Sequence, residues 1–454
     1  MKNYIYIFSL LLLISFFSCK RTSEKITTNP NAKLSFSQTV ITFDTIFTSI
    51  GTITQRLWVY NKNSHALSIS SIRLGKLSTS SYSFIINGQE NYELSNYEIF
   101  GKDSLLVLIK VLINPQNKSL PYLVEDSLEF TTNGNVQDVD LTAYGQDAIF
   151  LTNTTVACNT TWTNIKPYVI NGNVTVPAGC TLTVDLGTRI RFHKNATLTV
   201  AGTLIAQGNK DSIVTFRHDN LSSYYDDIAG QWGGLIFKSG SKNNHLLYTE
   251  IKNATTGISM YPEPDGDTIA ELKIENSIVK NCSKNLITVM ATDFYAVNSL
   301  LNNCVGYIFN ASSGGNYYFD FCTLTNYSYD FFREASILRL SNQDSTISTP
   351  IVAKLRNTIL WGDMVDEITL NNDGVDGFTF SADYSILKSS LTITNNNSLF
   401  NQDPLFTDEY NKKFTLKAGP PASPAINAGI PLPSITTDLV GAARGANPNM
   451  GCYE

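Results

Sequence analysis

Short runs of alternating apolar and polar residues recur about every eight positions between residues 174 and 216. The apolar pairs are Val174/Val176, Leu182/Val184, Ile190/Phe192 and Leu198/Val200. A period of two is typical of β-strands with one face turned inward, and the Gly, Pro, Asn and Asp residues between the pairs are typical of turns. Three strands with their turns span the 24 residues from Val174 to Leu198. The pattern therefore predicts the stacked rungs of a parallel β-helix, because one rung alone cannot bury its apolar face.

Similar segments ending in asparagine return later in the chain, at intervals of 28, 22 and 23 residues. They are LLYTEIKN, IENSIVKN, AVNSLLNN and FDFCTLTN, which end at Asn253, Asn281, Asn303 and Asn326. Stacked asparagine amides can form hydrogen bonds from rung to rung and tolerate a left-handed backbone. We therefore interpret the asparagines as architectural, with a ligand-binding row as the alternative.

A different strand pattern precedes the β-helix. Residues 34–147 contain about seven short apolar runs separated by turn signals, which predicts a β-sandwich. The order FDTIFTSIG, RLWVYNKNSHALSISSIRL, GKDSLLVLIKVLINPQ and VDLTAYGQ resembles immunoglobulin-like domains of the ASH and centrosomal-protein type. The resemblance implies a spacer or interaction module.

Two further stretches resemble bacterial right-handed β-helix proteins of the pectate-lyase-like superfold. One is the sequence from Trp162, WTNIKPYVINGNVTVPAGCTLTVDLGT, and the other is the closing segment with DPLF, SPAINAG and GCYE. The resemblance implies a right-handed parallel β-helix over residues 148–400 and a cap over residues 401–454. We expect the cap to cover the open end of the coil, with a salt bridge between Asp438 and Arg444. The predicted fold class is all-β: an N-terminal sandwich, a β-helix and a C-terminal cap.

The first 19 residues have the features of an export signal. Lys2 precedes an apolar run from Ile5 to Phe17, and Ser18 stands before Cys19. This arrangement resembles the processing site of bacterial lipoproteins, Bacteroidetes among them, which implies lipidation of Cys19 and a location in the outer membrane or cell envelope. A transmembrane anchor is the alternative, but the run is shorter than the roughly 20 residues that span a bilayer. Residues 20–33 are polar and predict a flexible tether.

Charge and cysteine content narrow the possible partners. The chain has 33 Lys and Arg against 39 Asp and Glu, and no basic cluster in the sequence beyond Lys20 and Arg21. We therefore expect no nucleic-acid partner. No cysteine and histidine spacing fits zinc, so we expect no cofactor. Cys158 and Cys180 are either a disulfide or two buried thiols, and Cys282 and Cys304 should be neighbours in successive rungs.

The candidate catalytic residues are carboxylates in turns. Hydrolases of this superfold use carboxylates on adjacent strands, and its lyases use Ca²⁺ with a basic residue. Asp226 and Asp227 form one candidate acid pair. The other candidates are Asp363, Asp366 and Glu367, which follow Trp361, a candidate aromatic platform for a sugar. For each of them a turn or a solvated loop is the alternative.

The candidate metal ligands are equally weak. Glu263, Asp265 and Asp267 form a candidate Ca²⁺ site that would matter only in an enzyme, and a Pro- and Gly-rich turn is the alternative. A turn is also the alternative for Asp373 and Asp376. The four histidines are too scattered to predict a catalytic triad.

Three functions are compatible with these features. The preferred one is a lipid-anchored, non-enzymatic protein that presents a β-helix wall to a glycan or an envelope protein. The alternatives are a polysaccharide lyase or glycoside hydrolase, and a purely structural envelope protein. The recognisable blocks are all architectural, and the residues that an enzyme would need are dispersed.

Overall fold

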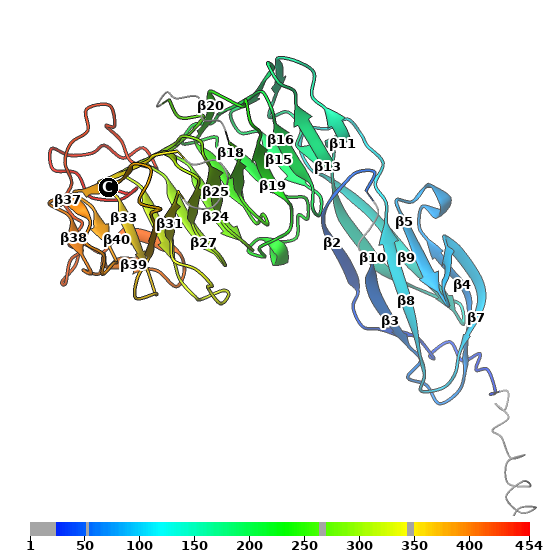
Figure 1. The fold of residues 1–454 in the computed structure, drawn as a ribbon. Coiled ribbons are helices and arrows are strands. Elements are labelled where there is room, and N and C mark those ends of the chain that lie inside the picture. The colour runs from blue at the N-terminus through cyan, green and yellow to red at the C-terminus, as the bar shows by residue number, and fades with distance from the viewer. Residues whose placement is uncertain (1–23, 51–53, 263–268, 343–348) are drawn as a thin grey trace, which may run out of the picture. The chain divides into compact units, whose positions relative to one another are not determined.

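The computed structural model describes residues 24–50, 54–262, 269–342 and 349–454 (Figure 1). The chain is almost entirely β-structure, as the sequence predicted, and it divides into two compact units, 1–146 and 147–454. Two 3-10 helices are found in the described ranges, η1 (Leu77–Thr79) and η2 (Ser223–Tyr225). Within those ranges, no helix has the length and apolar character needed to cross a membrane.

The first unit is a sandwich of two five-stranded sheets, with strand orders β1-β3-β8-β5-β6 and β2-β10-β9-β4-β7. The strands are β1 (Ser35–Phe36), β2 (Val40–Phe47), β3 (Gln55–Tyr60), β4 (Leu67–Leu74), β5 (Tyr82–Ile86), β6 (Gln89–Asn91), β7 (Glu93–Ile99), β8 (Ser104–Val111), β9 (Tyr122–Thr132) and β10 (Asn135–Gln146). About seven strands were predicted, and β5, β6 and β7 were missed. The edge strand β7 is mostly exposed, so it has no apolar alternation to detect.

The second unit is a parallel β-helix with three walls. Each wall is a column of short strands in which every strand pairs with the equivalent strand of the next rung. The first wall consists of β15 (Arg189–Phe192), β18 (Val214–His218), β21 (Thr249–Lys252), β24 (Ile278–Cys282), β27 (Leu300–Cys304), β30 (Thr323–Asn326), β33 (Ile359–Gly362), β36 (Ile386–Leu387) and β38 (Leu399–Phe400). The second wall consists of β16 (Thr197–Val200), β19 (Gly234–Phe237), β22 (Ile258–Met260), β25 (Ile287–Met290), β28 (Phe309–Ser312), β31 (Leu338–Ser341) and β34 (Ile368–Asn371).

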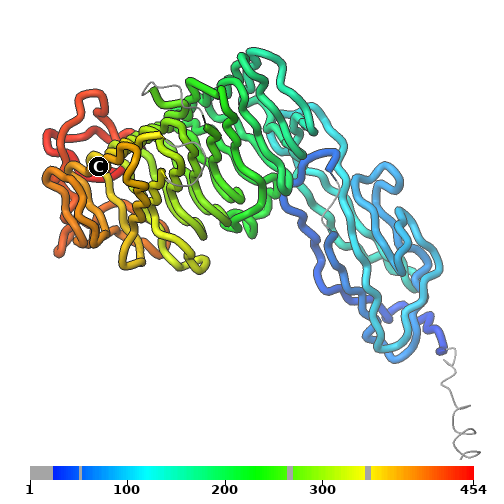
Figure 2. The backbone as a smooth tube through the Cα atoms, in the orientation of Figure 1, coloured from blue at the N-terminus to red at the C-terminus, as the bar shows by residue number. Residues whose placement is uncertain are grey.

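The third wall forms a separate ten-stranded sheet. It consists of β12 (Thr160–Trp162), β14 (Thr181–Asp185), β17 (Thr203–Gln207), β20 (Asn244–Leu247), β23 (Leu272–Glu275), β26 (Phe294–Val297), β29 (Gly315–Asp320), β32 (Ile351–Arg356), β35 (Phe378–Asp383) and β37 (Thr394–Asn396). At the coil entrance, β11 (Ile149–Thr155) pairs with the long strand β13 (Tyr168–Val176), which in turn pairs with β15 and β16. The continuous backbone trace in Figure 2 shows the successive turns of this coil.

The predicted period of the rungs is confirmed by the strand register. Val174 pairs with Leu198, which is the 24-residue return expected from the sequence. The inward side chains form one continuous core, in which the rings of Phe192 and Trp232 stack with centroids 4.0 Å apart. Cys282 and Cys304 are Cα partners in adjacent strands and are both buried, as predicted.

Asparagine forms one corner of the coil, as the repeated segments predicted. Asn281 donates to the Asn253 amide oxygen at 2.7 Å, and Asn303 donates to the Asn281 amide oxygen at 3.2 Å. All three have a positive φ between 61° and 68°, a conformation that asparagine tolerates better than most residues. Asn326 departs from the ladder, because its amide bonds the Cys304 backbone.

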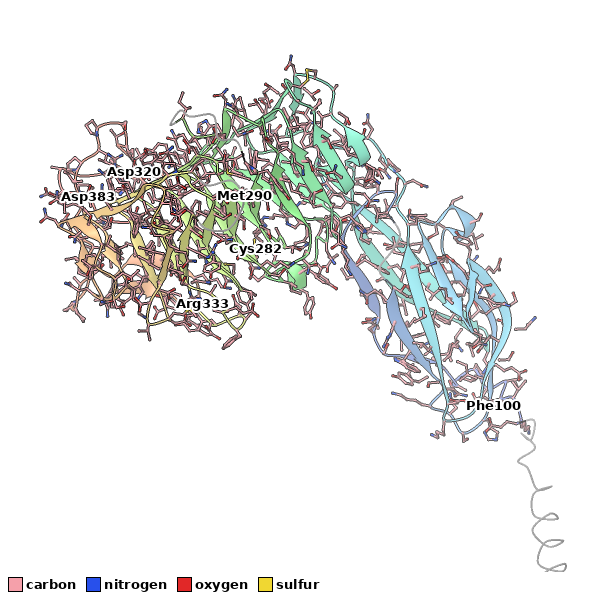
Figure 3. The ribbon with its side chains drawn as sticks, in the orientation of Figure 1. Phe100, Cys282, Met290, Asp320, Arg333 and Asp383 are labelled. Atoms are coloured by element: carbon pink, nitrogen blue, oxygen red, sulfur yellow. A yellow bond between two sulfur atoms is a disulfide. The ribbon has the colours of Figure 1, made fainter. Side chains whose placement is uncertain are left out.

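A disulfide links Cys158 and Cys180 at the coil entrance, with a Cα–Cα distance of 4.9 Å (Figure 3). The bridge closes a loop with a sequence separation of 22, and restriction of the unfolded chain by such a loop is worth about 3 kcal/mol. We expect the double variant C158A/C180A to lose about that much unfolding free energy in a denaturant titration. A reducing agent should destabilise the native protein to the same extent and leave the double variant unchanged.

The C-terminal segment packs along the outer side of the coil, a position that the sequence did not predict. The hairpin of β39 (Phe406–Asp408) and β40 (Lys413–Leu416) and the residues after it cover an apolar outward column of the first wall, which includes Leu300, Ile359 and Ile386. Asn276 donates to the Asp438 carbonyl at 2.7 Å, so the contact reaches far back along the coil. The outward column attracts the segment because it would otherwise expose apolar surface.

The predicted salt bridge between Asp438 and Arg444 is wrong. The Asp438 carboxylate accepts hydrogen bonds from the backbone N–H groups of Val440, Ala442 and Glu454, at 2.8 to 2.9 Å. Arg444 instead pairs with the Glu454 carboxylate at 3.2 Å. The turn after Asp438 supplies several N–H donors, and these take up the carboxylate.

Candidate functional site

The first wall carries a column of positive side chains on its outer surface. In β15, β18, β21 and β24 the residue after the buried central one is Arg191, Arg217, Lys252 and Lys280, and we call these four residues the cationic row. Arg191 is the Cα partner of Arg217, and Lys252 is the partner of Lys280. Adjacent strands lie about 4.8 Å apart, so the four charges stand in single file along the coil.

Few carboxylates balance the row. Glu250 lies in the neighbouring outward column, where it accepts a hydrogen bond from Arg217 Nε at 2.8 Å and faces Lys280 Nζ at 2.9 Å. Asp227 Oδ1 lies 3.7 Å from Lys252 Nζ, but its side chain is 74% exposed. One buried carboxylate, Glu250, and the two exposed carboxylates of Asp226 and Asp227 therefore face four cations, in a chain whose formal net charge is −6.

The cations of the row are crowded and partly buried. Burial, followed by the charge of Arg217, lowers the pKa of Arg191 to about 10. Burial and then Arg217 also lower the pKa of Lys252. Burial opposes ionisation of Glu250, but Lys280 and Arg217 outweigh it and lower the pKa of Glu250. A ligand anion above the row would relieve the repulsion by Arg217, which adds to the effect of burial in both cations.

Two buried polar atoms on the same wall, Thr215 Oγ1 and Asn302 Oδ1, have no hydrogen-bond partner within the described part of the chain. Buried polar groups are nearly always paired in folded proteins, so these two atoms are exceptions. Burial, followed by the charge of Arg191, lowers the pKa of His218 on this wall to about 4, so its ring is neutral near pH 7.

The row continues into later rungs with polar and aromatic residues. Asn302 is the Cα partner of Lys280, Thr325 is the partner of Asn302, and Trp361 is the partner of Thr325. The outer face of the first wall thus changes along its length from cationic to neutral polar. These three residues are at most 8% exposed, because residues of the C-terminal segment, such as Phe414, pack beside them.

The predicted acid pair lies beside this row. Asp226 and Asp227 follow η2 in the segment after β18, and the Asp226 carbonyl accepts a hydrogen bond from the Asn253 amide at 2.8 Å. Asp227 faces Lys252. These contacts place the pair as counter-charges near a basic wall.

The second carboxylate candidates are brought together by Arg333, which the sequence analysis missed. Arg333, labelled in Figure 3, is buried. It lies 2.9 and 2.6 Å from the two carboxylate oxygens of Glu367 and next to Asp363. Asp366 instead accepts from the Ser390 backbone N–H at 2.6 Å. Because Arg333 stands 30 residues or more from its partners in sequence, only the folded coil reveals this cluster.

Trp361, the candidate platform, is a buried wall residue. It is 8% exposed, and Lys388 Nζ lies over its ring at 5.1 Å from the centroid. One ring face is therefore occupied by a side chain of the protein itself.

Cys19, Glu263, Asp265 and Asp267 lie outside the described residues. Across the ranges that are described, no group of three or more His, Cys, Asp or Glu side chains is arranged to hold a metal ion. Asn342 donates to the Asp373 carboxylate at 2.8 Å, which ties this turn to the preceding rung.

The third wall offers an internal comparison, because its outward cations are paired. Lys273 lies 2.6 Å from Glu275, which also contacts His245 at 3.1 Å, and Lys354 lies 3.1 Å from Asp383. Positive charge on this wall is thus offset locally. Both walls carry outward cations. They differ because the cations of the first wall outnumber the carboxylates near them.

The pairing of Glu275 predicts a pH effect on stability. Hydrogen bonds from His245 and then Lys273 lower the pKa of Glu275 to about 2, below its ordinary value of 4.5. A carboxyl group whose pKa is lower in the folded than in the unfolded chain stabilises the folded protein at a pH above the unfolded pKa. For Glu275 this stability is lost as the pH falls from 4.5 through about 2. We expect E275Q to remove about 2 kcal/mol of this acid-sensitive stability. In denaturant titrations, the loss of unfolding free energy between pH 7 and acid pH should be smaller for E275Q than for the native protein.

The cationic row was not found in the sequence, which shows no basic cluster beyond Lys20 and Arg21. Its members are separated by 26 to 35 residues, because loops of unequal length intervene between the rungs. A search for Arg or Lys one position after the buried centre of each first-wall strand would have found it. That search requires the strand register, which the regular stretch at 174–216 provides only for the first rungs.

Comparisons with known proteins leave the family open. No protein-family model matches the chain. A stretch of 102 residues is 31% identical to part of "Protein bark beetle" of Drosophila melanogaster, and the match covers 21% of this chain and 3% of that protein. The chain therefore spans only a small fraction of this curated relative.

Among solved structures, the chain has likenesses of low similarity. An ASH / PapD-like domain of human CEP192 aligns at 14% identity with a TM-score of 0.19, over 29% of this chain and 96% of that one. A family 123 glycoside hydrolase from Clostridium perfringens aligns at 12% identity with a TM-score of 0.17, over 24% and 25% of the two chains. At these TM-scores the likenesses carry no argument about function.

Proposed function

We propose that this protein is a binding protein for an anionic glycan, which lies along the first wall with its acidic groups over the cationic row. The single observation that carries the proposal is the file of four cations, Arg191, Arg217, Lys252 and Lys280, which outnumber the three carboxylates near them. Charge-assisted hydrogen bonds from Arg and Lys to carboxylates or sulfates are the strong contacts in such a site.

The geometry favours a glycan over a nucleic acid. The cations stand in one file, at a strand spacing comparable to the length of one sugar unit. The export signal proposed from the sequence supports this choice, because an exported chain would meet envelope glycans. A duplex would need a broader basic face with many phosphate contacts.

The experiment is a binding titration with oligogalacturonate, alginate oligomers and heparin as anionic probes, and with dextran as the neutral control. We expect binding of at least one anionic probe, with affinity that falls as salt is raised, and no binding of dextran. Single-stranded DNA added as a competitor identifies a general polyanion site. Binding of dextran alone, or preference for DNA over every glycan, would contradict the proposal.

A lyase or hydrolase is the alternative function. Two observations favour the binding role. Arg333 and the serines at 389 and 390 occupy the carboxylates of Asp363, Asp366 and Glu367, and Asp227 faces Lys252. Incubation with oligogalacturonate followed by chromatography separates the two. Intact oligomers after incubation support the binding role. Shorter or unsaturated products would show that the protein is a hydrolase or a lyase.

We also propose that Cys19 anchors the protein to a membrane of the cell envelope, on the strength of the signal sequence before it. Metabolic labelling with a radioactive fatty acid tests this. Labelling of the native protein and its loss in C19S are expected, and an unlabelled native protein would contradict the anchor.

A further inference from the structure

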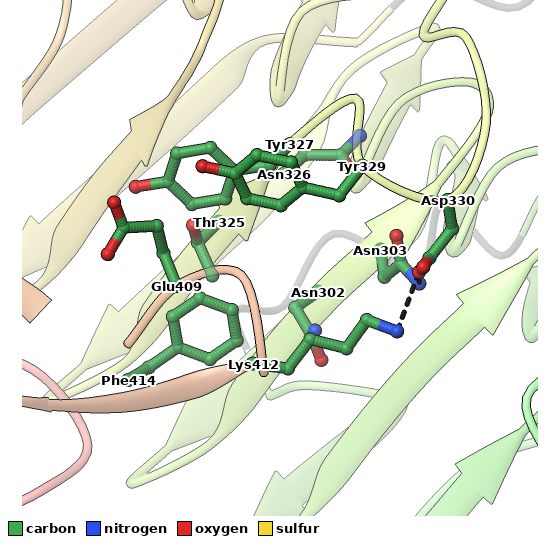
Figure 4. A pocket seen from close by; sticks show the side chains of 10 residues that line it. All are labelled: Asn302, Asn303, Thr325, Asn326, Tyr327, Tyr329, Asp330, Glu409, Lys412 and Phe414. Atoms are coloured by element: carbon green, nitrogen blue, oxygen red, sulfur yellow. Dashed lines mark hydrogen bonds and ion pairs between the residues drawn. The ribbon is translucent and has the colours of Figure 1, made fainter. Parts of the chain in front are cut away.

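A small hollow lies on the first wall, next to the cationic row. Its floor is formed by Asn302 and Thr325, and its rim by the aromatic residues Tyr327, Tyr329 and Phe414 (Figure 4). The hollow has a volume of about 220 Å³ with its mouth included, and its inner part admits about one water-sized group. Asn302 is the Cα partner of Lys280, so the hollow begins one strand beyond the last cation of the row.

The floor of the hollow has unused hydrogen-bonding capacity. Asn302 is 2% exposed, and its Oδ1 has no hydrogen-bond partner within the described residues. Thr325 is fully buried and lies within hydrogen-bonding reach of Tyr327. A buried amide oxygen without a donor is costly, and one hydroxyl group of a ligand would satisfy it. The floor is therefore suited to a ligand that brings a hydroxyl donor.

The rim offers aromatic faces. The rings of Tyr327 and Tyr329 stack with centroids 5.4 Å apart, and Tyr410 meets Tyr329 edge-on at 5.3 Å. Tyr329 is 47% exposed and Tyr410 is 68% exposed. Exposed, mutually supported aromatic rings present a rigid apolar surface with polar hydroxyl tips, which suits the C–H face of a sugar ring.

The charge of the hollow differs from that of the cationic row. Its ionisable lining residues are Asp330, Glu409 and Lys412, and Lys412 lies 2.6 Å from Asp330. Asn303 also donates to Asp330 at 2.6 Å, which fixes this rim (Figure 4). Two carboxylates against one ammonium disfavour an acidic group here, so the occupant should be uncharged.

We infer that the hollow is a subsite for a neutral sugar unit of the glycan whose acidic groups lie on the cationic row. The sugar ring rests against Tyr329 and Tyr410, and one of its hydroxyl groups enters the hollow and donates to Asn302 Oδ1. This inference rests on the proposed glycan binding and adds the class of ligand: a chain that combines acidic and neutral sugars. A chain of acidic sugars alone would leave the hollow unused.

The test compares two probes by calorimetric titration. Oligogalacturonate contains acidic units only, and hyaluronan oligomers alternate an acidic with a neutral sugar. We expect Y329A and N302L to weaken hyaluronan binding about threefold to tenfold and to leave oligogalacturonate binding within about twofold. Y410A should resemble Y329A, and because Tyr410 is largely exposed it serves if N302L fails to fold. Y318A, on the third wall, is the matched control.

The outcomes distinguish the neutral subsite from the glycan binding on the cationic row. If Y329A and N302L weaken the binding of both probes equally, or of neither, the neutral subsite is overturned. If K252M still weakens the binding of both probes in that case, the cationic row is upheld. Failure of the native protein to bind either probe overturns both the subsite and the proposed function.

Discussion

Replacing Lys252 with methionine should weaken binding of an anionic glycan by about tenfold or more. Methionine keeps most of the shape of the buried stem, since the Lys252 side chain is 7% exposed, and removes only the charge. A hydrogen bond to a charged group contributes about 1.5 to 3 kcal/mol, which corresponds to roughly a 10-fold to 100-fold change in affinity. The partner carboxylate of Asp227 is 74% exposed, so losing the lysine leaves no buried charge behind.

The matched control for this variant is K273M on the third wall. Lys273 is also an outward lysine of a wall strand, but it lies 2.6 Å from Glu275 and its charge is offset. K273M should leave affinity within about twofold, and the salt dependence of binding should become shallower in K252M only. Equal losses in K252M and K273M would contradict a site on the first wall.

Replacing Arg333 with methionine should destabilise the later rungs by about 3 to 5 kcal/mol, because removing one partner of a buried ion pair leaves an uncompensated charge. Glu367 would then be fully buried without its cation, since both side chains are at most 1% exposed. A coil of stacked rungs can open locally. Hydrogen exchange of the β30, β31 and β33 amides is therefore the sensitive measurement, with β15 and β18 as internal references.

The double variant R333M/E367L tests the origin of that loss. Replacing both charges with apolar side chains of similar size should restore most of the protection, since neither charge is left unpaired. K210A is the surface control, because Lys210 and Asp211 are 56% and 76% exposed and such pairs contribute little. If R333M changed the opening free energy of β30, β31 and β33 by less than about 1 kcal/mol, the ion pair of Arg333 and Glu367 would not stabilise the later rungs.

Much of the architecture was predictable because it follows from local periodicity. The alternation from Val174 to Val200 sets the rung length, and the strand register confirms it. The asparagine corner at Asn253, Asn281 and Asn303 was predictable because a left-handed turn favours that residue at a fixed place in each rung. The polar edge strand β7 was missed because an exposed edge carries no apolar alternation.

The candidate site was less predictable because it depends on contacts between distant residues. Arg333 bonds carboxylates 30 to 34 residues away, and the cationic row joins residues from four rungs. The sequence analysis concentrated on neighbouring acids, such as Asp363, Asp366 and Glu367. The fold separates Asp366 from the other two, because successive residues of a tight turn point to different neighbours.

The most direct test of the central claim is a crystal structure of the protein with a bound short oligo-uronate. We expect the sugar chain to run along the coil on the first wall, with carboxylates within hydrogen-bond distance of Arg217, Lys252 or Lys280. An oligo-uronate bound on the third wall, near Lys273 and Lys354, or on the first unit would contradict it.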